Sequence, residues 1–366
     1  MDSTTLDCTT PPASRQDPLL ISCREQDHRR SASTWRRAVE RGDALRLAPG
    51  VFCRTEVWFR HAPWDRYLLS AVAHALSRQD PVIFIGITAL LLHGLPTADV
   101  PAHLEVRAGS PGRAGVTHQP KLYRDGVPEV QAYLKHLQAT GQDFDGSFPV
   151  QPLVRRRWSR RQPTEDPDTI TVQLSDGTEV GTVLAASLHH ALSDVLVREP
   201  LLVSVTPADA AKRLHREWAA AFTDLAEPLI ASKSGLRRLL AAWSFADGRA
   251  ESPGESLSRA AAHELGFVVP ESQKNLYDGA NQWIARVDHW WEEVNLAGEF
   301  DGRSKYSSGF RKPGDSWQDA LVREKEREDA IRRTGAGVAR WVWKDVRDLP
   351  RFARLLIHHG VPRRAG

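Results

Sequence analysis

The most constraining feature of the sequence is a pair of carboxylates, Glu299 and Asp301, followed directly by Gly302. Alternate residues of a β-strand share a face, so both side chains are expected on the same side of a sheet. Upstream, residues 283–291 are rich in aromatic and β-branched side chains and predict another strand. The polar run 292–295 predicts the turn between them. The stretch therefore predicts a β-hairpin that ends in acids.

The register of this hairpin decides which charges meet. With Trp291 paired to Leu296 across the turn, counting back places Asp288 opposite Glu299. Directly opposed Cβ atoms lie about 5 Å apart, and like charges at that distance destabilise a sheet. A bound hard cation such as Mg²⁺ would account for such a pair, because carboxylate oxygens are its usual protein ligands.

Two explanations of the acids stay open at this point. The same register places Arg286 opposite Asp301, and Lys305 follows just beyond. In the first explanation, the acids at the hairpin end bind a metal ion. In the second, Arg286 and Lys305 neutralise them at a purely structural hairpin, since ion-pair networks also gather acids.

Five motifs occur in a fixed order around this hairpin: Glu255-Ser-Leu-Ser-Arg259, Arg286-Val-Asp288, Glu299-Phe-Asp301-Gly-Arg-Ser-Lys305, Glu324-Lys-Glu-Arg-Glu-Asp329 and Gly337-Val-Ala-Arg-Trp-Val-Trp343. In this order and spacing, residues 251–345 resemble the very-short-patch-repair-like branch of the PD-(D/E)xK endonuclease fold. The resemblance predicts a helix, the acidic hairpin, a charged helix and a final strand entered through a glycine. Glu255 and Arg259 lie one turn apart on the first helix, where they can pair.

The resemblance implies a Mg²⁺-dependent endonuclease domain, and it assigns roles to residues that match the family's motifs. The implied catalytic residues are Glu255, Asp288, Glu299, Asp301 and Lys305, of which Asp288, Glu299 and Asp301 are the implied metal ligands. The chain departs from the family pattern twice. Lys305 stands where the family usually has a histidine, and Asp301 stands where the wider superfamily carries its lysine. Either Lys305 supplies that cation from a shifted position, or activity is weakened.

The N-terminal part of the chain predicts a helix followed by a hairpin. Residues 33–42 have an apolar stripe and end in glycine, and residues 44–53 contain a Pro-Gly turn between two short apolar runs. This is the layout of a winged helix-turn-helix. Arginines lie on or near both elements, at Arg29, Arg30, Arg36, Arg37, Arg41, Arg46 and Arg54. They suit contacts to DNA phosphates and guanine edges, and the alternative is a core-packing helix with a solvated basic face.

The segment Leu45-Arg-Leu-Ala-Pro-Gly-Val-Phe52 resembles the wing of AbiEi-family antitoxin regulators, and the likeness continues through residues 83–96. The resemblance implies binding to double-stranded DNA and, as a second partner, a cognate toxin. The residues predicted to contact DNA are Arg36, Arg37, Arg41 and Arg46.

A further basic motif, Arg155-Arg-Arg-Trp-Ser-Arg-Arg161, places five arginines around one tryptophan. Such a motif can bind a nucleic-acid backbone and stack on a base. It can equally be an exposed loop whose charges keep it solvated.

Composition limits the class of protein. The chain has 366 residues, 41% hydrophobic and 26% charged, which suffices for two or three globular domains. Its three cysteines, at positions 8, 23 and 53, lack the spacing of a zinc site and fit a reducing compartment. The first residues do not read as a signal peptide, and no apolar run is long enough for a bilayer. We expect a cytoplasmic protein with no membrane partner.

Together these patterns predict a multi-domain α/β (α+β) protein. The expected parts are a disordered tail (1–16), a winged helix-turn-helix (17–60), an AbiEi-like α+β middle region (61–246) with a loop-rich insert near 132–168, and a restriction-endonuclease-like α/β domain (247–366). The expected function is DNA binding combined with Mg²⁺-dependent endonuclease activity, in phage defence or a toxin–antitoxin system. The alternative is an AbiEi-like antitoxin and transcriptional regulator whose nuclease-like domain is catalytically inactive.

Overall fold

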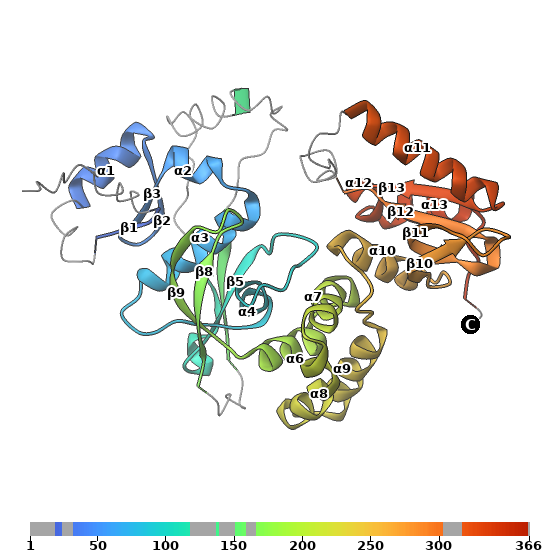
Figure 1. Ribbon diagram of the computed structural model, residues 1–366. Helices are drawn as coiled ribbons and strands as arrows, with labels where there is room; N and C mark the ends of the chain where they lie inside the picture. Colours follow the sequence, from blue (N-terminus) through green and yellow to red (C-terminus); the bar gives the residue numbers. More distant parts are fainter. Residues whose placement is uncertain are drawn as a thin grey trace, which may run out of the picture. The chain divides into compact units, whose positions relative to one another are not determined.

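The computed structural model describes residues 19–23, 32–117, 137–138, 151–158, 166–302 and 317–364. Helices combine with three sheets, which confirms the expected multi-domain α/β class (Figure 1). The chain divides into two compact units. The first contains Met1–Pro81, Thr117–Leu153 and Thr171–Thr182, and the second contains Val82–Val116, Val154–Ile170 and Val183–Gly366.

The first unit holds the predicted helix and hairpin. Its helices are α1 (Ala32–Arg41), α2 (Thr55–Arg60) and α3 (Pro63–Leu76), and its small sheet has the order β1 (Ile21–Ser22), β3 (Val51–Arg54), β2 (Ala44–Ala48). All pairings in this sheet are antiparallel. The Pro-Gly turn reverses the chain because Gly50 adopts a φ of +76°, a conformation that costs glycine little. The predicted 44–53 hairpin is thus confirmed.

The middle of the chain contributes a six-stranded mixed sheet. Its order is β6 (Gly115–Thr117), β7 (Leu153–Arg157), β5 (His103–Arg107), β4 (Ile83–Phe84), β9 (Glu179–Ala185), β8 (Asp168–Gln173). The central strand β4 pairs antiparallel with β5 and parallel with β9. Directly after β4, the chain enters the short helix α4 (Gly86–Leu92), which is almost entirely buried.

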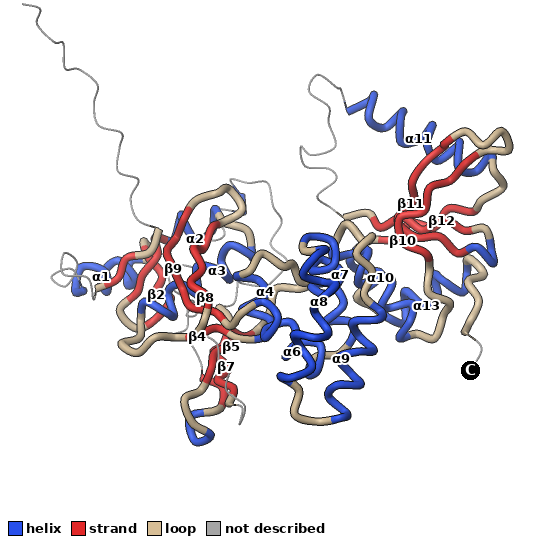
Figure 2. Tube along the Cα trace, turned by 60° about the horizontal axis from the view of Figure 1, so that its bottom comes forward, coloured by secondary structure: helices blue, strands red, loops and turns tan. Residues whose placement is uncertain are grey.

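A group of helices follows in the second unit, packed together as Figure 2 shows: α6 (Leu188–Arg198), α7 (Leu201–Leu214), α8 (Arg216–Ala226) and α9 (Lys233–Phe245). The backbone leaves helical geometry at His215, with φ −128° and ψ 56°, so α7 ends there and α8 begins one residue later.

The C-terminal part contains a four-stranded sheet, called here the C-terminal sheet. Its order is β10 (Glu271–Tyr277), β11 (Trp283–Trp291), β12 (Leu296–Phe300), β13 (Gly337–Trp341). The first three strands are antiparallel, and β13 runs parallel to β12 after the long helix α11 (Trp317–Arg333). Before the sheet comes α10 (Pro253–Glu264), and after it come α12 (Trp343–Val346) and α13 (Leu349–His358). The predicted final strand therefore ends two residues early, because Trp343 already begins a helix.

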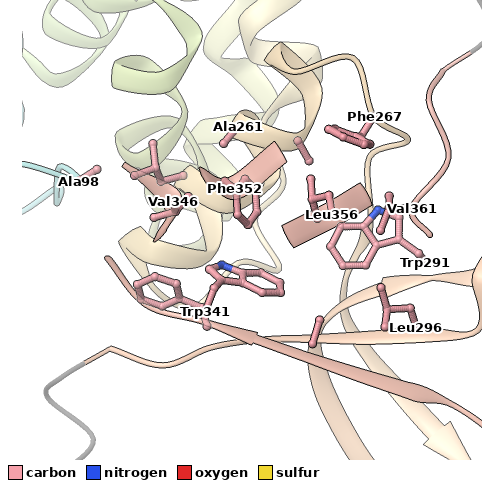
Figure 3. Close-up of a cluster of buried hydrophobic side chains, with 14 residues drawn as sticks. Ala98, Ala261, Phe267, Trp291, Leu296, Trp341, Val346, Phe352, Leu356 and Val361 are labelled. Carbon is pink, nitrogen blue, oxygen red and sulfur yellow. The ribbon is translucent and has the colours of Figure 1, made fainter. Parts of the chain in front are cut away.

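The C-terminal sheet has a core on each face. On one face, α10 and α13 pack against a cluster that includes Trp291, Trp341 and Phe352 (Figure 3). On the other, α11 contributes Ile331 to a smaller cluster. Burial of large aromatic side chains supplies most of the driving force for such packing. Among the described residues, no helix is both long and apolar enough to cross a membrane.

Candidate functional site

The hairpin register predicted from the sequence is confirmed for three pairs: Trp291 with Leu296, Trp290 with Ala297 and His289 with Gly298. Asp288 and Glu299 follow next in this register. Beyond His289 and Gly298, the contact between the two strands is made by the side chain of Asp288.

Asp288 Oδ2 accepts a hydrogen bond from the backbone N–H of Phe300 at 2.9 Å. The carboxylate of Asp288 therefore caps the end of β12, and the two strands are joined there by a charged hydrogen bond. Such bonds are roughly twice as strong as neutral ones, so the position of this acid is well defined.

A second carboxylate, from α10, lies beside Asp288. Gln273 Nε2 donates to Glu255 Oε2 at 2.8 Å and to Asp288 Oδ1 at 3.3 Å, so one neutral amide links the two acids. Burial, and next the negative charge of Asp288, raise the pKa of Glu255 above its ordinary value. This Glu255–Asp288 acid pair is the centre of the candidate site.

The helix α10 fixes Glu255 in place. Ser252 is the N-cap residue, and its Oγ accepts from the Glu255 backbone N–H at 3.3 Å. The Glu255 carboxylate in turn accepts from the N–H of Glu251 at 2.9 Å. The predicted ion pair between Glu255 and Arg259 does not form, because Arg259 instead makes two hydrogen bonds of 2.8 and 2.9 Å to the carboxylate of Asp209.

Glu299 has a different partner from the one that the sequence suggested. Its buried carboxylate accepts from Arg327 of α11 at 2.7 Å. Arg286, expected near these acids, pairs with the exposed Glu251 at 2.8 Å. The other expected cation, Lys305, lies outside the described residues. The structure therefore directs Glu299 toward α11, whereas Asp288 is bonded to β10 and to the backbone of β12.

Asp301 lies just past the end of β12, where its N–H donates to the carbonyl of Trp341 at 2.9 Å. Its carboxylate is 3.6 Å from Arg340, which also contacts Glu328 of α11 at 3.0 Å. Asp301 is thus close to β13 and α11 and does not join the acid pair.

The fit to a metal ion can be judged from this geometry. Within the described ranges, no group of three or more His, Cys, Asp or Glu side chains is arranged to hold a metal ion. Mg²⁺, however, is usually bound through one or two carboxylates, with water and substrate phosphate completing the shell. The acid pair supplies two carboxylates with hard oxygen donors, and the side-chain amide of Gln273 donates to both of them. Glu255 and Asp288 therefore fit Mg²⁺, while Glu299 and Asp301 are engaged by arginines.

Two residues of the site were missed by sequence reasoning. Gln273 belongs to a β-strand yet has a φ of +54°, which a strand pattern does not reveal. Arg327 is one of many charges on a helix that is polar on most of its surface, and no local pattern indicates that it faces Glu299.

The predicted DNA-contacting arginines lie on the solvent-exposed surface of the first unit. Arg36, Arg37 and Arg41 are exposed on α1, and Arg46 is the exposed residue of β2. The opposite side of α1 is held by buried Ala38 and by Trp35, which stacks on Phe52 with ring centroids 6.2 Å apart.

An acid offsets part of this basic charge, since Arg41 pairs with Asp43 at 2.8 Å. The arginines at positions 29 and 30 fall outside the described residues.

Comparison with known proteins finds similar proteins, but none with a stated activity. No protein-family model matches the chain. The chain is similar to two proteins of Mycobacterium tuberculosis, "Uncharacterized protein MT2308" of strain CDC 1551 / Oshkosh and "Uncharacterized protein Rv2248" of strain ATCC 25618 / H37Rv. Each is 28% identical over 213 residues, which span 52% of this chain and 74% of the relative. Neither name states a function, so the acid pair and the exposed arginines carry the functional reasoning.

Proposed function

We propose that the protein binds double-stranded DNA and that its C-terminal part is a Mg²⁺-dependent endonuclease. The observation that carries the proposal is the Glu255–Asp288 acid pair, which lies beside the end of β12. Its two carboxylates share the amide of Gln273, although burial and the charge of Asp288 raise the pKa of Glu255. Active sites are where such unfavourable pairs are retained.

The chain's own residues have separate tasks in this proposal. Asp288 and Glu255 hold the metal, and Asp288 is oriented for this by the Phe300 N–H. Glu299 positions Arg327, whose guanidinium suits a scissile phosphate. A bound Mg²⁺ supplies Lewis acidity toward the phosphate and a lowered pKa for the attacking water.

The first unit supplies DNA affinity in the same proposal. The exposed guanidinium groups of Arg36, Arg37, Arg41 and Arg46 lie on α1 and β2, where their side chains are free of the core. Phosphate contacts of this kind position a protein on DNA and make its affinity salt-dependent. In this proposal the protein acts on DNA in the cytoplasm, a reducing compartment.

The test is cleavage of plasmid, linear and mismatched DNA by the full chain with and without Mg²⁺. Asp288→Asn and Glu255→Gln are expected to abolish cleavage while leaving DNA binding intact. Glu251→Gln is the matched control, because it removes an exposed carboxylate four residues from Glu255. No cleavage of any substrate by the parent protein, or equal loss in the control, would refute the proposal.

A second candidate function is favoured by one observation. Arg327 and Arg340 engage Glu299 and Asp301, two of the acids that the family resemblance assigns to the metal. In this alternative the protein is an antitoxin-type DNA-binding regulator, and the nuclease-like part binds a cognate toxin without catalysis. Calorimetric titration with Mg²⁺ separates the two, since the regulator is expected to bind DNA but show no Mg²⁺ binding that depends on Asp288.

A further inference from the structure

A cavity of about 580 Å³ opens in the second unit, away from the acid pair. Its wall is formed by the β4–α4 junction, the ends of β5 and β7, helix α6 and the start of α9. We call it the α6/α9 cavity. Pockets for small ligands commonly measure about 300–1,000 Å³, so this cavity has room for a molecule of nucleotide size.

The cavity wall is rich in guanidinium groups. Among the described residues that line it, Arg107, Arg157, Arg198 and Arg238 are cationic, and Asp194 is the one carboxylate. Most of the charged side chains among the described lining residues are therefore cationic. Guanidinium groups bind phosphate through two parallel hydrogen bonds, which favours an anionic ligand.

Two of these arginines are already used by the fold. Arg157 lies 2.5 Å from the buried carboxylate of Glu105 and 3.1 Å from Glu199. Arg198 pairs with Asp194 one turn before it on α6. These contacts hold the side chains in place and neutralise much of their charge.

The other two arginines remain available. Among the described residues, no carboxylate lies within ion-pair distance of Arg107 or Arg238. Arg238 stands on α9, whose N-terminal end also lines the cavity at Ser232, the N-cap residue. The positive end of the helix dipole adds to the attraction for an anion there.

The remaining wall is apolar and includes an aromatic ring. Ile85, Val197 and Ile230 contribute aliphatic surface, and Trp158 contributes a half-buried indole at the end of β7. A ligand that satisfies both parts has a phosphate and a flat ring system. Bases stack on aromatic side chains in nucleic-acid-binding proteins, at about 1–3 kcal/mol per base.

A shallower hollow adjoins the cavity along α9. It is lined by Ser234, Arg237, Arg238 and Ala241, so Arg238 is common to both. The basic surface therefore continues beyond the cavity along α9, where Arg237 adds a second guanidinium group.

We propose that the α6/α9 cavity binds a nucleoside phosphate, with the phosphate at Arg107 and Arg238 and the base against Trp158 and the apolar wall. The nucleotide has two sources with the same chemistry. It is either a free mononucleotide or the terminal nucleotide of a single strand, whose next phosphate lies at Arg237.

The test is calorimetric titration of the full chain with AMP, adenosine, inorganic phosphate and a short single-stranded oligonucleotide phosphorylated at its 5′ end. AMP is expected to bind at about millimolar affinity or tighter, and more tightly than adenosine or phosphate alone. The double variant Arg107→Gln/Arg238→Gln is expected to weaken AMP binding by about tenfold or more, because each charged hydrogen bond contributes a factor of that order.

The matched control is Arg113→Gln/Arg216→Gln, which removes two exposed arginines from the same unit outside the cavity. It is expected to bind AMP as the parent does. Ala231→Glu adds a carboxylate at an exposed lining position and serves as an independent variant, with the same loss expected as for the double variant.

The oligonucleotide decides the source of the nucleotide. Tighter binding of the oligonucleotide than of AMP, reduced by Arg237→Gln, assigns the cavity to a strand end, and equal binding assigns it to free nucleotides. The proposal is overturned by absence of binding for both AMP and the oligonucleotide, by phosphate alone binding as tightly as AMP, or by the same loss in the matched control.

Discussion

The ion pair between Glu299 and Arg327 allows a quantitative test of the C-terminal fold. The carboxylate side chain is 4% exposed and the guanidinium 29%, at a distance of 2.7 Å. Exposed pairs contribute about 0–1 kcal/mol, and breaking a fully buried pair costs about 3–5 kcal/mol. This half-covered pair lies between those limits, so Glu299→Gln is expected to lower the free energy of unfolding by about 2 kcal/mol.

The assay is a double-mutant cycle with Glu299→Gln, Arg327→Gln and both together. Arg327 also donates to the carbonyl of Arg286 at 2.9 Å, so its single replacement removes a second hydrogen bond. The cycle cancels that contribution and isolates the pair, with an expected coupling energy of about 1–2 kcal/mol. Unfolding of the full chain is followed by denaturant titration. The free energy is taken from the unfolding transition whose midpoint changes in Glu299→Gln.

Arg332→Gln is the matched control on the same helix. Arg332 contacts Glu328 at the same distance of 2.7 Å, but both side chains are more exposed, at 52% and 29%. Its replacement is expected to cost about 0.3–0.5 kcal/mol, as for other exposed pairs one helical turn apart. A coupling energy for Glu299 and Arg327 no larger than the control's effect would refute the assignment of Arg327 as the partner of Glu299.

Three further predictions follow from charges elsewhere. The pKa of Glu255 is raised in the folded protein, so its contribution to stability is full below the pKa of the unfolded state. That contribution is lost as the pH rises through the folded-state pKa. Glu255→Gln should therefore flatten the plot of stability against pH between these two pKa values, in metal-free thermal melts. Asp209→Ala leaves Arg259 buried without its carboxylate and should cost about 3–5 kcal/mol in denaturant unfolding, and a cost below about 1 kcal/mol contradicts this. Replacing Arg36 and Arg37 by alanine should lower the salt dependence of DNA binding by about one unit of slope for each phosphate that the protein no longer neutralises, and an unchanged slope excludes α1 from the interface.

Local sequence patterns were sufficient where local geometry decides the structure. The 292–295 turn was correctly predicted from its polar residues, and its length then fixed the pairing of Trp291 with Leu296. A helix that carries Glu255 and Arg259 was also predicted, and the structure has it as α10 (Pro253–Glu264). Each of these depends on residues within a few positions of one another, which is the range over which turn and cap chemistry acts.

Partners of charged groups were not predictable in the same way. Arg259 has Glu255 one turn away, yet it pairs with Asp209, which is 50 residues distant in sequence. Glu299 likewise takes its partner from α11, 28 residues away. The packing of whole helices decides these contacts. A buried guanidinium needs a carboxylate partner because an unpaired buried charge is strongly destabilising.

The position of the acid pair follows from packing between α10 and the C-terminal sheet. Gly254 lies in the first turn of α10 against the ring of Phe300, and a Cβ at that position would overlap the ring. The next residue is Glu255, and the N–H of Phe300 is the group that Asp288 accepts from. One close approach therefore brings the helix that carries Glu255 to the strand end that orients Asp288. The absence of a side chain at Gly254 permits this approach, and the hydrogen bonds from Phe300 and Gln273 then hold the two acids beside each other.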